Sequence, residues 1–210
     1  EDLLPLDAEV FYFKGLLAAE EQDTSCRVLN LQKAIAQKAD YKDAYLELIR
    51  LYKNYGAFLK AREYNRIAIQ NVGQGDAVLS FEYGEIMENM HKKDSALFFY
   101  EKSFSLDNKM WKAYHQTAWI YFQERNFTEA KIFLDKCVAI RPQYRASNYL
   151  LGVIHEYRLA NLEKAQKYYE TALETAPEDL ALQKAVRRVK WKIHRATLPI
   201  HYKKDSAKSL

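Results

Sequence analysis

The chain repeats itself with a period of about 34 residues, and this period limits its fold more than any other feature. The segment from Ala44 to Ala61 has the same order of small, aromatic and aliphatic residues as the segment from Ala113 to Ala130. Such a period indicates an array in which each unit is one supersecondary motif that packs on its neighbours. Extended along the chain, the register defines five units, which span residues 8–41, 42–76, 77–110, 111–144 and 145–179.

Within each unit the pattern predicts a helix, a short turn and a second helix. Three positions of the unit are expected to be small, because the two helices cross there with their backbones close together. Thirteen of these fifteen residues are Ala, Gly, Ser or Cys. In unit order the three positions hold Gly15, Ile49, Gly84, Ala118 and Gly152, then Arg27, Ala61, Ala96, Ala130 and Ala165, then Ala34, Ala68, Ser103, Cys137 and Ala172.

The period and the residue pattern resemble those of the tetratricopeptide repeat (TPR). Its aromatic and leucine positions match Tyr45 and Leu48 in the second unit, and its closing proline matches Pro142 and Pro177. The resemblance covers residues 8–179. It implies an all-α fold, a right-handed TPR superhelix (α-solenoid) of about five helix-turn-helix repeats plus a C-terminal capping helix.

The capping helix is predicted over residues 180–196. The last repeat of a solenoid exposes an apolar flank, so a helix with a polar outer face is needed to cover it. Residues 1–7 are expected to form an N-terminal extension and residues 197–210 a basic tail. The apolar residues of the predicted helix recur on one helical face, which is expected to point inward; they are Leu182, Val186, Val189 and Ile193.

Positive charge is concentrated at the C-terminus. The chain has a net charge of +4, while residues 181–210 contain nine Lys and Arg against one acid, Asp205. The favoured interpretation is a capping helix with solvated charges on its outer face. The alternative is an adaptor surface that docks an acidic partner. No nucleic acid is expected as a partner.

The residues that catalysis needs do not gather in any recognised motif. The chain contains no phosphate-binding glycine loop, no H-E-x-x-H and no C-x-x-C. We predict that Cys137 and His155 pack in the core, and that Glu85 and Glu88 are a solvated or partner-facing pair. The sequence therefore predicts no catalytic residue, no metal and no cofactor, and favours a binding module over an enzyme; a hidden hydrolase is a third, weaker alternative.

The TPR resemblance also implies where a partner binds. The first helices of such repeats line a concave groove. Large aromatic residues at groove positions are typical anchors of binding hot spots, and nearby acids would select a partner segment that carries Lys or Arg. The residues predicted to form the groove are Arg50, Lys53, Asn54, Phe81, Glu85, Glu88, Asn89, His115, Trp119, Phe122, Gln123, Tyr149, Glu156 and Tyr157.

The predicted partner is an extended or helical segment of another protein. Some TPR domains hold a terminal carboxylate with a Lys/Asn/Arg clamp, but the matching positions include Leu16, Val78 and Glu82, which disfavours that mode. A structural homo-oligomer, in which one groove takes the terminus of another copy, is the alternative.

The compartment is predicted only from a second resemblance. The tyrosine-rich units resemble periplasmic TPR lipoproteins of the Bacteroidetes, which implies a role in the cell envelope and a location in the periplasm or on a membrane facing it. Contact with that membrane would be through a removed lipid anchor. A cytoplasmic location is the alternative. The chain opens on Glu1 rather than Met, so we expect a processed or trimmed product.

Overall fold

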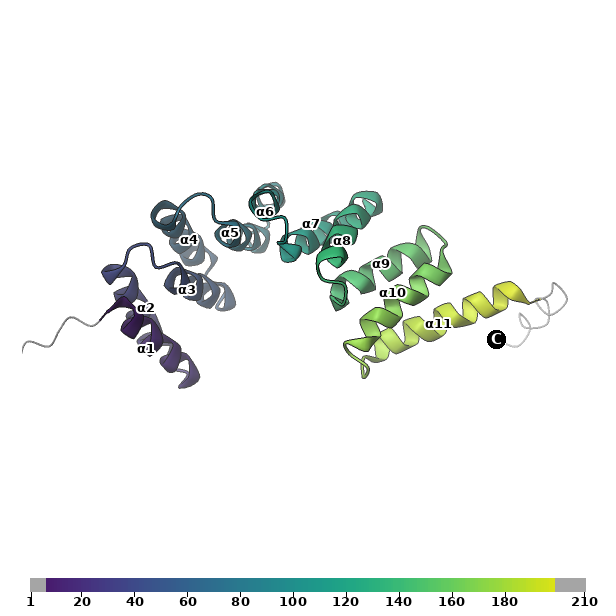
Figure 1. The fold of residues 1–210 in the computed structure, drawn as a ribbon, viewed down its shortest axis with the longest axis horizontal. Helices are drawn as coiled ribbons and strands as arrows, with labels where there is room; N and C mark the ends of the chain where they lie inside the picture. Colours follow the sequence, from purple (N-terminus) through teal and green to yellow (C-terminus); the bar gives the residue numbers. More distant parts are fainter. Residues whose placement is uncertain (1–6, 199–210) are drawn as a thin grey trace, which may run out of the picture. The chain divides into compact units, whose positions relative to one another are not determined.

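The computed structural model describes residues 7–198, and within them it consists of eleven α-helices (Figure 1). The predicted all-α fold, with five helix-turn-helix repeats and one further helix, is confirmed. The predicted extension, apart from Asp7, and the predicted basic tail beyond Leu198 lie outside the described residues. The helices are α1 (Ala8–Glu20), α2 (Thr24–Gln37), α3 (Lys42–Asn54), α4 (Phe58–Val72), α5 (Ala77–Asn89), α6 (Lys93–Leu106), α7 (Trp111–Gln123), α8 (Phe127–Ile140), α9 (Arg145–Tyr157), α10 (Leu162–Glu174) and α11 (Leu180–Thr197).

The chain divides into two compact units, residues 1–113 and 114–210. In the first, α1 packs on α2, α3 on α4 and α5 on α6, and each pair packs on the next. In the second, α8 packs on α9, α9 on α10 and α10 on α11. Each unit is thus a stack of helical hairpins.

The turns within the five hairpins share one backbone feature, a residue in the left-handed conformation. In each of the five, one residue has a positive φ, which reverses the chain after the first helix. Only Gly56 among them is a glycine, although residues that carry a Cβ disfavour the left-handed region. Several second helices then begin with an Asp or Asn side chain that accepts a backbone N–H, as Asn126 Oδ1 does from Glu129. The other four turn residues are Gln22 (φ 59°), His91 (58°), Arg125 (61°) and Ala160 (49°).

Glycines at the helix crossings face tyrosine rings. A Cβ on Gly84 would lie 2.5 Å from Cδ1 of Tyr100, and a Cβ on Gly152 would lie 2.5 Å from Cε1 of Tyr169. Both tyrosines are fully buried. The first position of the repeat is therefore small where a tyrosine of the second helix occupies the crossing.

Helix α11 covers the last repeat. Leu182, Val186 and Val189 are buried against Tyr169 and Ala172 of α10. Ile193 is partly buried in the same cluster, so the apolar face expected to point inward does so. No helix of residues 7–198 is long and apolar enough to cross a membrane.

Candidate binding cleft

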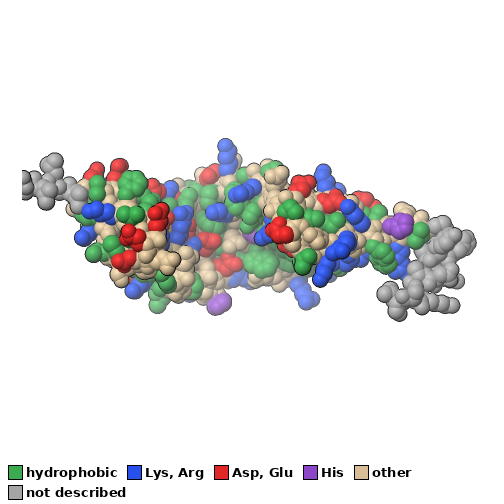
Figure 2. Space-filling model, turned by 90° about the horizontal axis from the view of Figure 1, so that it is seen from below, with side chains coloured by type: hydrophobic (Ala, Val, Ile, Leu, Met, Phe, Trp, Pro, Cys, Tyr) green, Lys and Arg blue, Asp and Glu red, His purple; other side chains and the backbone are tan. Residues whose placement is uncertain are grey.

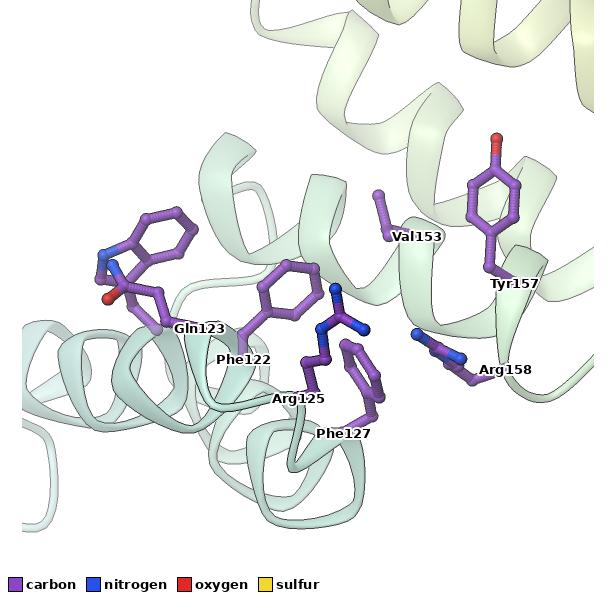
Figure 3. Close-up of a pocket in the computed structure, with 8 residues that line it drawn as sticks. Phe122, Gln123, Arg125, Phe127, Val153, Tyr157 and Arg158 are labelled. Atoms are coloured by element: carbon purple, nitrogen blue, oxygen red, sulfur yellow. The ribbon is translucent and has the colours of Figure 1, made fainter.

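A cleft of about 610 Å³ opens in the second unit, where the last turns of α7 and α9 meet the turns that follow them (Figure 3). Helices α7 and α9 are the first helices of the fourth and fifth repeats, so they supply groove residues as predicted. The cleft is lined by Trp119, Phe122, Gln123, Arg125, Phe127, Val153, Tyr157 and Arg158.

The floor of the cleft is aromatic. The rings of Trp119 and Phe122 are stacked, with an interplanar angle of 8° and centroids 6.2 Å apart. Phe122 meets Phe127 edge-on at 5.4 Å. Trp119 is 36% exposed and Tyr157 is 54% exposed, so a bound segment could cover both. Phe122 and Phe127 pack onto the core of the fourth repeat, which holds this surface rigid.

Two arginines add positive charge. Figure 3 shows Arg125 and Arg158 on either side of the Phe127 ring. The guanidinium carbon of Arg158 lies 4.2 Å from the centre of that ring, a cation–π contact. Neither arginine forms an ion pair within residues 7–198. Both are exposed, so their charge is available to a ligand.

Glu156, one of the groove acids predicted to select a basic partner together with Glu85 and Glu88, is neutralised internally. Arg188 of α11 binds Glu156 through two hydrogen bonds of 2.8 Å, and Lys192 binds it at 2.7 Å. The hydroxyl of Tyr169 donates a further bond of 3.0 Å. Because Glu156 is only 6% exposed, the prediction of an exposed partner-facing acid is wrong at this position.

The same contacts set the ionisation of Glu156. Burial by itself would raise its pKa, but the hydrogen bonds from Arg188, Lys192 and Tyr169 outweigh burial and lower the pKa to about 2. Arg188 and Lys192 also lie over the ring of Tyr157, at 5.7 and 4.9 Å from its centre. The side of the cleft next to α11 therefore carries one negative and two positive charges.

Two other predicted residues of the second unit lie outside the cleft. Tyr149 is 41% exposed, and its ring contacts the ring of Tyr169. His115 is half-buried, and its Nδ1 lies 2.9 Å from the Ser147 hydroxyl oxygen. The structure therefore brings together Trp119, Phe122, Gln123 and Tyr157.

His115, Ser147 and Cys137 form a hydrogen-bonded chain that superficially resembles a catalytic triad. The Ser147 hydroxyl oxygen lies 3.1 Å from Sγ of Cys137 and 2.9 Å from Nδ1 of His115. Burial lowers the pKa of His115 to about 4 and raises the pKa of the Cys137 thiol. Both Ser147 and Cys137 are fully buried, so neither side chain can reach a substrate. The chain is a packing contact, and the predicted core position of Cys137 is correct.

The predicted groove residues of the first unit form an ion-pair cluster. Buried Glu82 accepts hydrogen bonds from Arg50 and Lys53, and Lys53 also binds Glu85. Glu88 accepts a bond of 2.6 Å from the Tyr100 hydroxyl. Burial raises the pKa of Glu88, and the bond from Tyr100 only partly offsets this.

The exposed side chains of this cluster are polar. Asn54 and Asn89 are exposed, and Asn89 donates to the Glu85 carbonyl at 2.8 Å. Phe81 is 5% exposed and packs on the Tyr100 ring, so the expectation that it is an exposed anchor is wrong. Within residues 7–198 no cluster of His, Cys, Asp and Glu is arranged to hold a metal ion.

The fourth and fifth repeats match a known family. Residues 112–144 and 146–179 match the tetratricopeptide repeat family. These two segments of the chain are therefore tetratricopeptide repeats. Solved TPR structures have the same fold: the chain superposes on YrrB, described as a TPR protein with an unusual peptide-binding site, with a TM-score of 0.61 and 18% identity over 86% of this chain and 92% of that one.

Two further similarities extend the comparison. PilW, described as a widely conserved type IV pilus biogenesis factor, superposes with a TM-score of 0.68 and 15% identity over 92% of this chain and 94% of PilW. The human protein O-mannosyl-transferase TMTC3 is 25% identical over 154 residues, which are 72% of this chain. The chain spans only 17% of the length of TMTC3.

Several residues that line or border the cleft could not be predicted from the TPR register. Arg125, Phe127 and Arg158 lie in the turns or at the start of a second helix, outside the first-helix positions that line a TPR groove. Arg188 and Lys192 lie on the capping helix, 32 and 36 residues beyond Glu156. That spacing is close to one repeat, which is the signal that α11 takes the place of a sixth first helix.

Proposed function

We propose that this TPR protein is a binding module whose second unit takes an extended segment of a partner protein. An apolar side chain of the segment enters the cleft beside Trp119 and Phe122. An acidic side chain next to it lies against Arg125 and Arg158. The observation that carries the proposal is an aromatic floor flanked by two exposed arginines that form no ion pair within residues 7–198.

The size and the chemistry of the cleft support this occupant. A volume of about 610 Å³ falls in the range of sites that enclose a small ligand or a few side chains. Arg guanidinium groups suit the planar geometry of a carboxylate. Since Glu156 is already neutralised by Arg188 and Lys192, a basic partner segment would find no free acid in this cleft.

The comparisons support protein binding in general terms. TPR solenoids form extended concave surfaces for binding. The YrrB description names a peptide-binding site in a protein of the same fold. We propose that binding, rather than catalysis, is the activity of this chain, because the contact between Ser147 and His115 lies in the core, where Ser147 is fully buried and cannot reach a substrate.

Selection of random peptides tests the proposal while the natural partner is still unidentified. A displayed library of short random peptides is selected on residues 1–210 and, in parallel, on the Trp119→Ala variant. We expect the selected peptides to combine an aromatic or aliphatic residue with a neighbouring Asp or Glu, and to bind Trp119→Ala about thirtyfold more weakly. The control for a non-specific charge effect is Arg66→Glu, which changes an exposed position of α4. Enrichment of Lys and Arg in the peptides would refute the proposal.

The compartment remains a prediction from the sequence. We propose the periplasmic side of the envelope, as the resemblance to envelope lipoproteins implies, with the cytoplasm as the alternative. Cell fractionation of the protein expressed from its natural gene distinguishes the two compartments.

A further inference from the structure

Helix α1 presents an apolar stripe that no described residue covers. Val10, Phe13 and Leu17 recur at i, i+3 and i+7, so they share one face of the helix. They are 38%, 62% and 55% exposed. Three large apolar side chains together on one face are typical of an interaction surface.

The same register positions are covered in other first helices. In α9 they include Leu150 and Ile154, which are at most 5% exposed. In α11 they are Leu182, Ala185 and Val189, which pack on α10. The stripe on α1 is therefore the face that takes the second helix of a preceding repeat. Its shape and chemistry suit a helix.

Helix α11 carries a complementary stripe on its outer face. Leu180, Lys184, Arg187 and Trp191 recur at i, i+4, i+7 and i+11 and are all exposed. Leu180 is 65% exposed and Trp191 is 50% exposed. Lys184 and Arg187 form no ion pair within residues 7–198. The stripe thus combines two apolar side chains with two available positive charges.

The two stripes have opposite charge. Glu9, Glu20 and Glu21 flank the apolar residues of α1, against the single base Lys14. In Figure 2, Asp and Glu side chains gather at the end of the chain that holds α1, whereas Lys and Arg side chains line the region toward the other end. Helix α11 contains six Lys and Arg and no acid.

We propose that α11 of one copy docks on α1 of a second copy, so that the protein assembles head to tail. In an antiparallel contact Trp191 would face Leu17 and Phe13 of the apolar stripe, and Lys184 and Arg187 would approach Glu20 and Glu21. Such a contact joins two different surfaces, so it leaves one of each free at the ends and continues into open chains. The inference goes beyond the proposed function, because it does not involve the binding cleft.

Sedimentation velocity over a concentration series tests the assembly. At about 0.1 M ionic strength, where charges act over about 10 Å, we expect oligomers that grow with concentration and weaken at about 1 M salt. Phe13→Ser or Trp191→Ser removes an exposed anchor and is expected to weaken association about thirtyfold. Arg62→Glu/Arg66→Glu changes surface charge on α4, which carries neither stripe, and is expected to associate like the unmodified chain.

Charge exchange gives the decisive test. The variant Glu20→Lys/Glu21→Lys makes the α1 edge basic, and Lys at the end of a helix is compatible with its dipole. The variant Lys184→Glu/Arg187→Glu makes the α11 edge acidic. Each variant alone opposes like charges and is expected to stay monomeric. An equimolar mixture restores opposite charges at both kinds of contact, so it is expected to assemble again.

Three results would overturn the proposal. The first is an unmodified chain that stays monomeric at its highest soluble concentration. The second is a mixture of the two charge variants that does not assemble. The third is a monomeric chain that binds vesicles containing phosphatidylserine and loses this binding only in Lys184→Glu/Arg187→Glu, which would show that the occupant of the α11 stripe is a lipid surface.

Discussion

Substitution of Gly152 by Ala tests the packing that defines each repeat. A Cβ at this position would lie 2.5 Å from Cε1 and 2.6 Å from Cδ1 of Tyr169. The ring cannot move freely, because Tyr169 is fully buried and its hydroxyl binds Glu156, which is itself held by Arg188. We therefore expect Gly152→Ala to destabilise the protein.

The expected magnitude follows from opposing contributions. Overpacking of a buried site costs about 1–3 kcal/mol. Loss of the hydrogen bond between Tyr169 and charged Glu156 would add about 1.5 kcal/mol. The higher helix propensity of Ala offsets about 1 kcal/mol. The net loss of unfolding free energy is about 1.5–3.5 kcal/mol, which urea denaturation followed by circular dichroism measures.

Two matched variants separate overpacking from helix propensity. At Gly15 a Cβ would meet only Leu31, at 3.0 Å from Cγ and 3.1 Å from Cδ2. Because a shift of Leu31 by a few tenths of an ångström relieves this contact, Gly15→Ala is expected to change stability by less than about 1 kcal/mol. In a Tyr169→Leu background, Gly152→Ala should no longer destabilise, since Ala118 and Leu134 coexist in the core of the fourth repeat. A Gly152→Ala protein as stable as the unmodified chain would refute the reasoning.

Three other predictions concern stability. Contacts in the folded protein lower the pKa of Glu156 to about 2, so they stabilise the fold fully above about pH 4.5 and lose this effect as the pH falls toward 2. Between about pH 4.5 and about pH 2, the urea midpoint of Glu156→Gln should therefore fall less than that of the unmodified chain. Ala130→Leu should lower the free energy of unfolding by about 1–3 kcal/mol through overpacking. Lys131→Ala removes only a surface ion pair with Asp135 and should lower it by less than about 0.5 kcal/mol. Equal urea midpoints for the two variants would contradict the repeat register. Truncation after Asp179 should expose the flank of α10 and cause aggregation, which light scattering detects, and a monomeric product of unchanged stability would show that α11 is no cap.

The repeat fold could be predicted from the sequence because its information is periodic. The three small positions located the helix crossings, but the sequence pattern did not explain why the residue at the first position varies between Gly, Ala and Ile. The structure shows that the size of the first position depends on the residue across the crossing: Gly84 and Gly152 face tyrosines, whereas Gly15 faces Leu31. Ile49, the exception in the sequence pattern, belongs to the repeat whose equivalent second-helix residue is Asn65.

The cleft was only partly predictable. A register assigns a residue to a face of a helix, but it does not say what neighbouring side chains cover it. Glu156 was expected to be exposed and is instead covered by Arg188 and Lys192, which come from the next helix. Arg125 lies in the cleft because its left-handed backbone conformation redirects the chain at the turn. The sequence has no glycine at this position that would indicate such a conformation.

The central claim, that the cleft selects an acidic segment, is tested most directly by a charge exchange between the protein and a selected peptide. Binding is measured by isothermal titration for the unmodified chain and for Arg125→Glu/Arg158→Glu, each with the acidic peptide and with its Asp and Glu replaced by Lys. We predict that the unmodified chain prefers the acidic peptide and that the double variant reverses this preference. An unchanged preference for the acidic peptide in Arg125→Glu/Arg158→Glu would contradict the assignment of the cleft as the binding site.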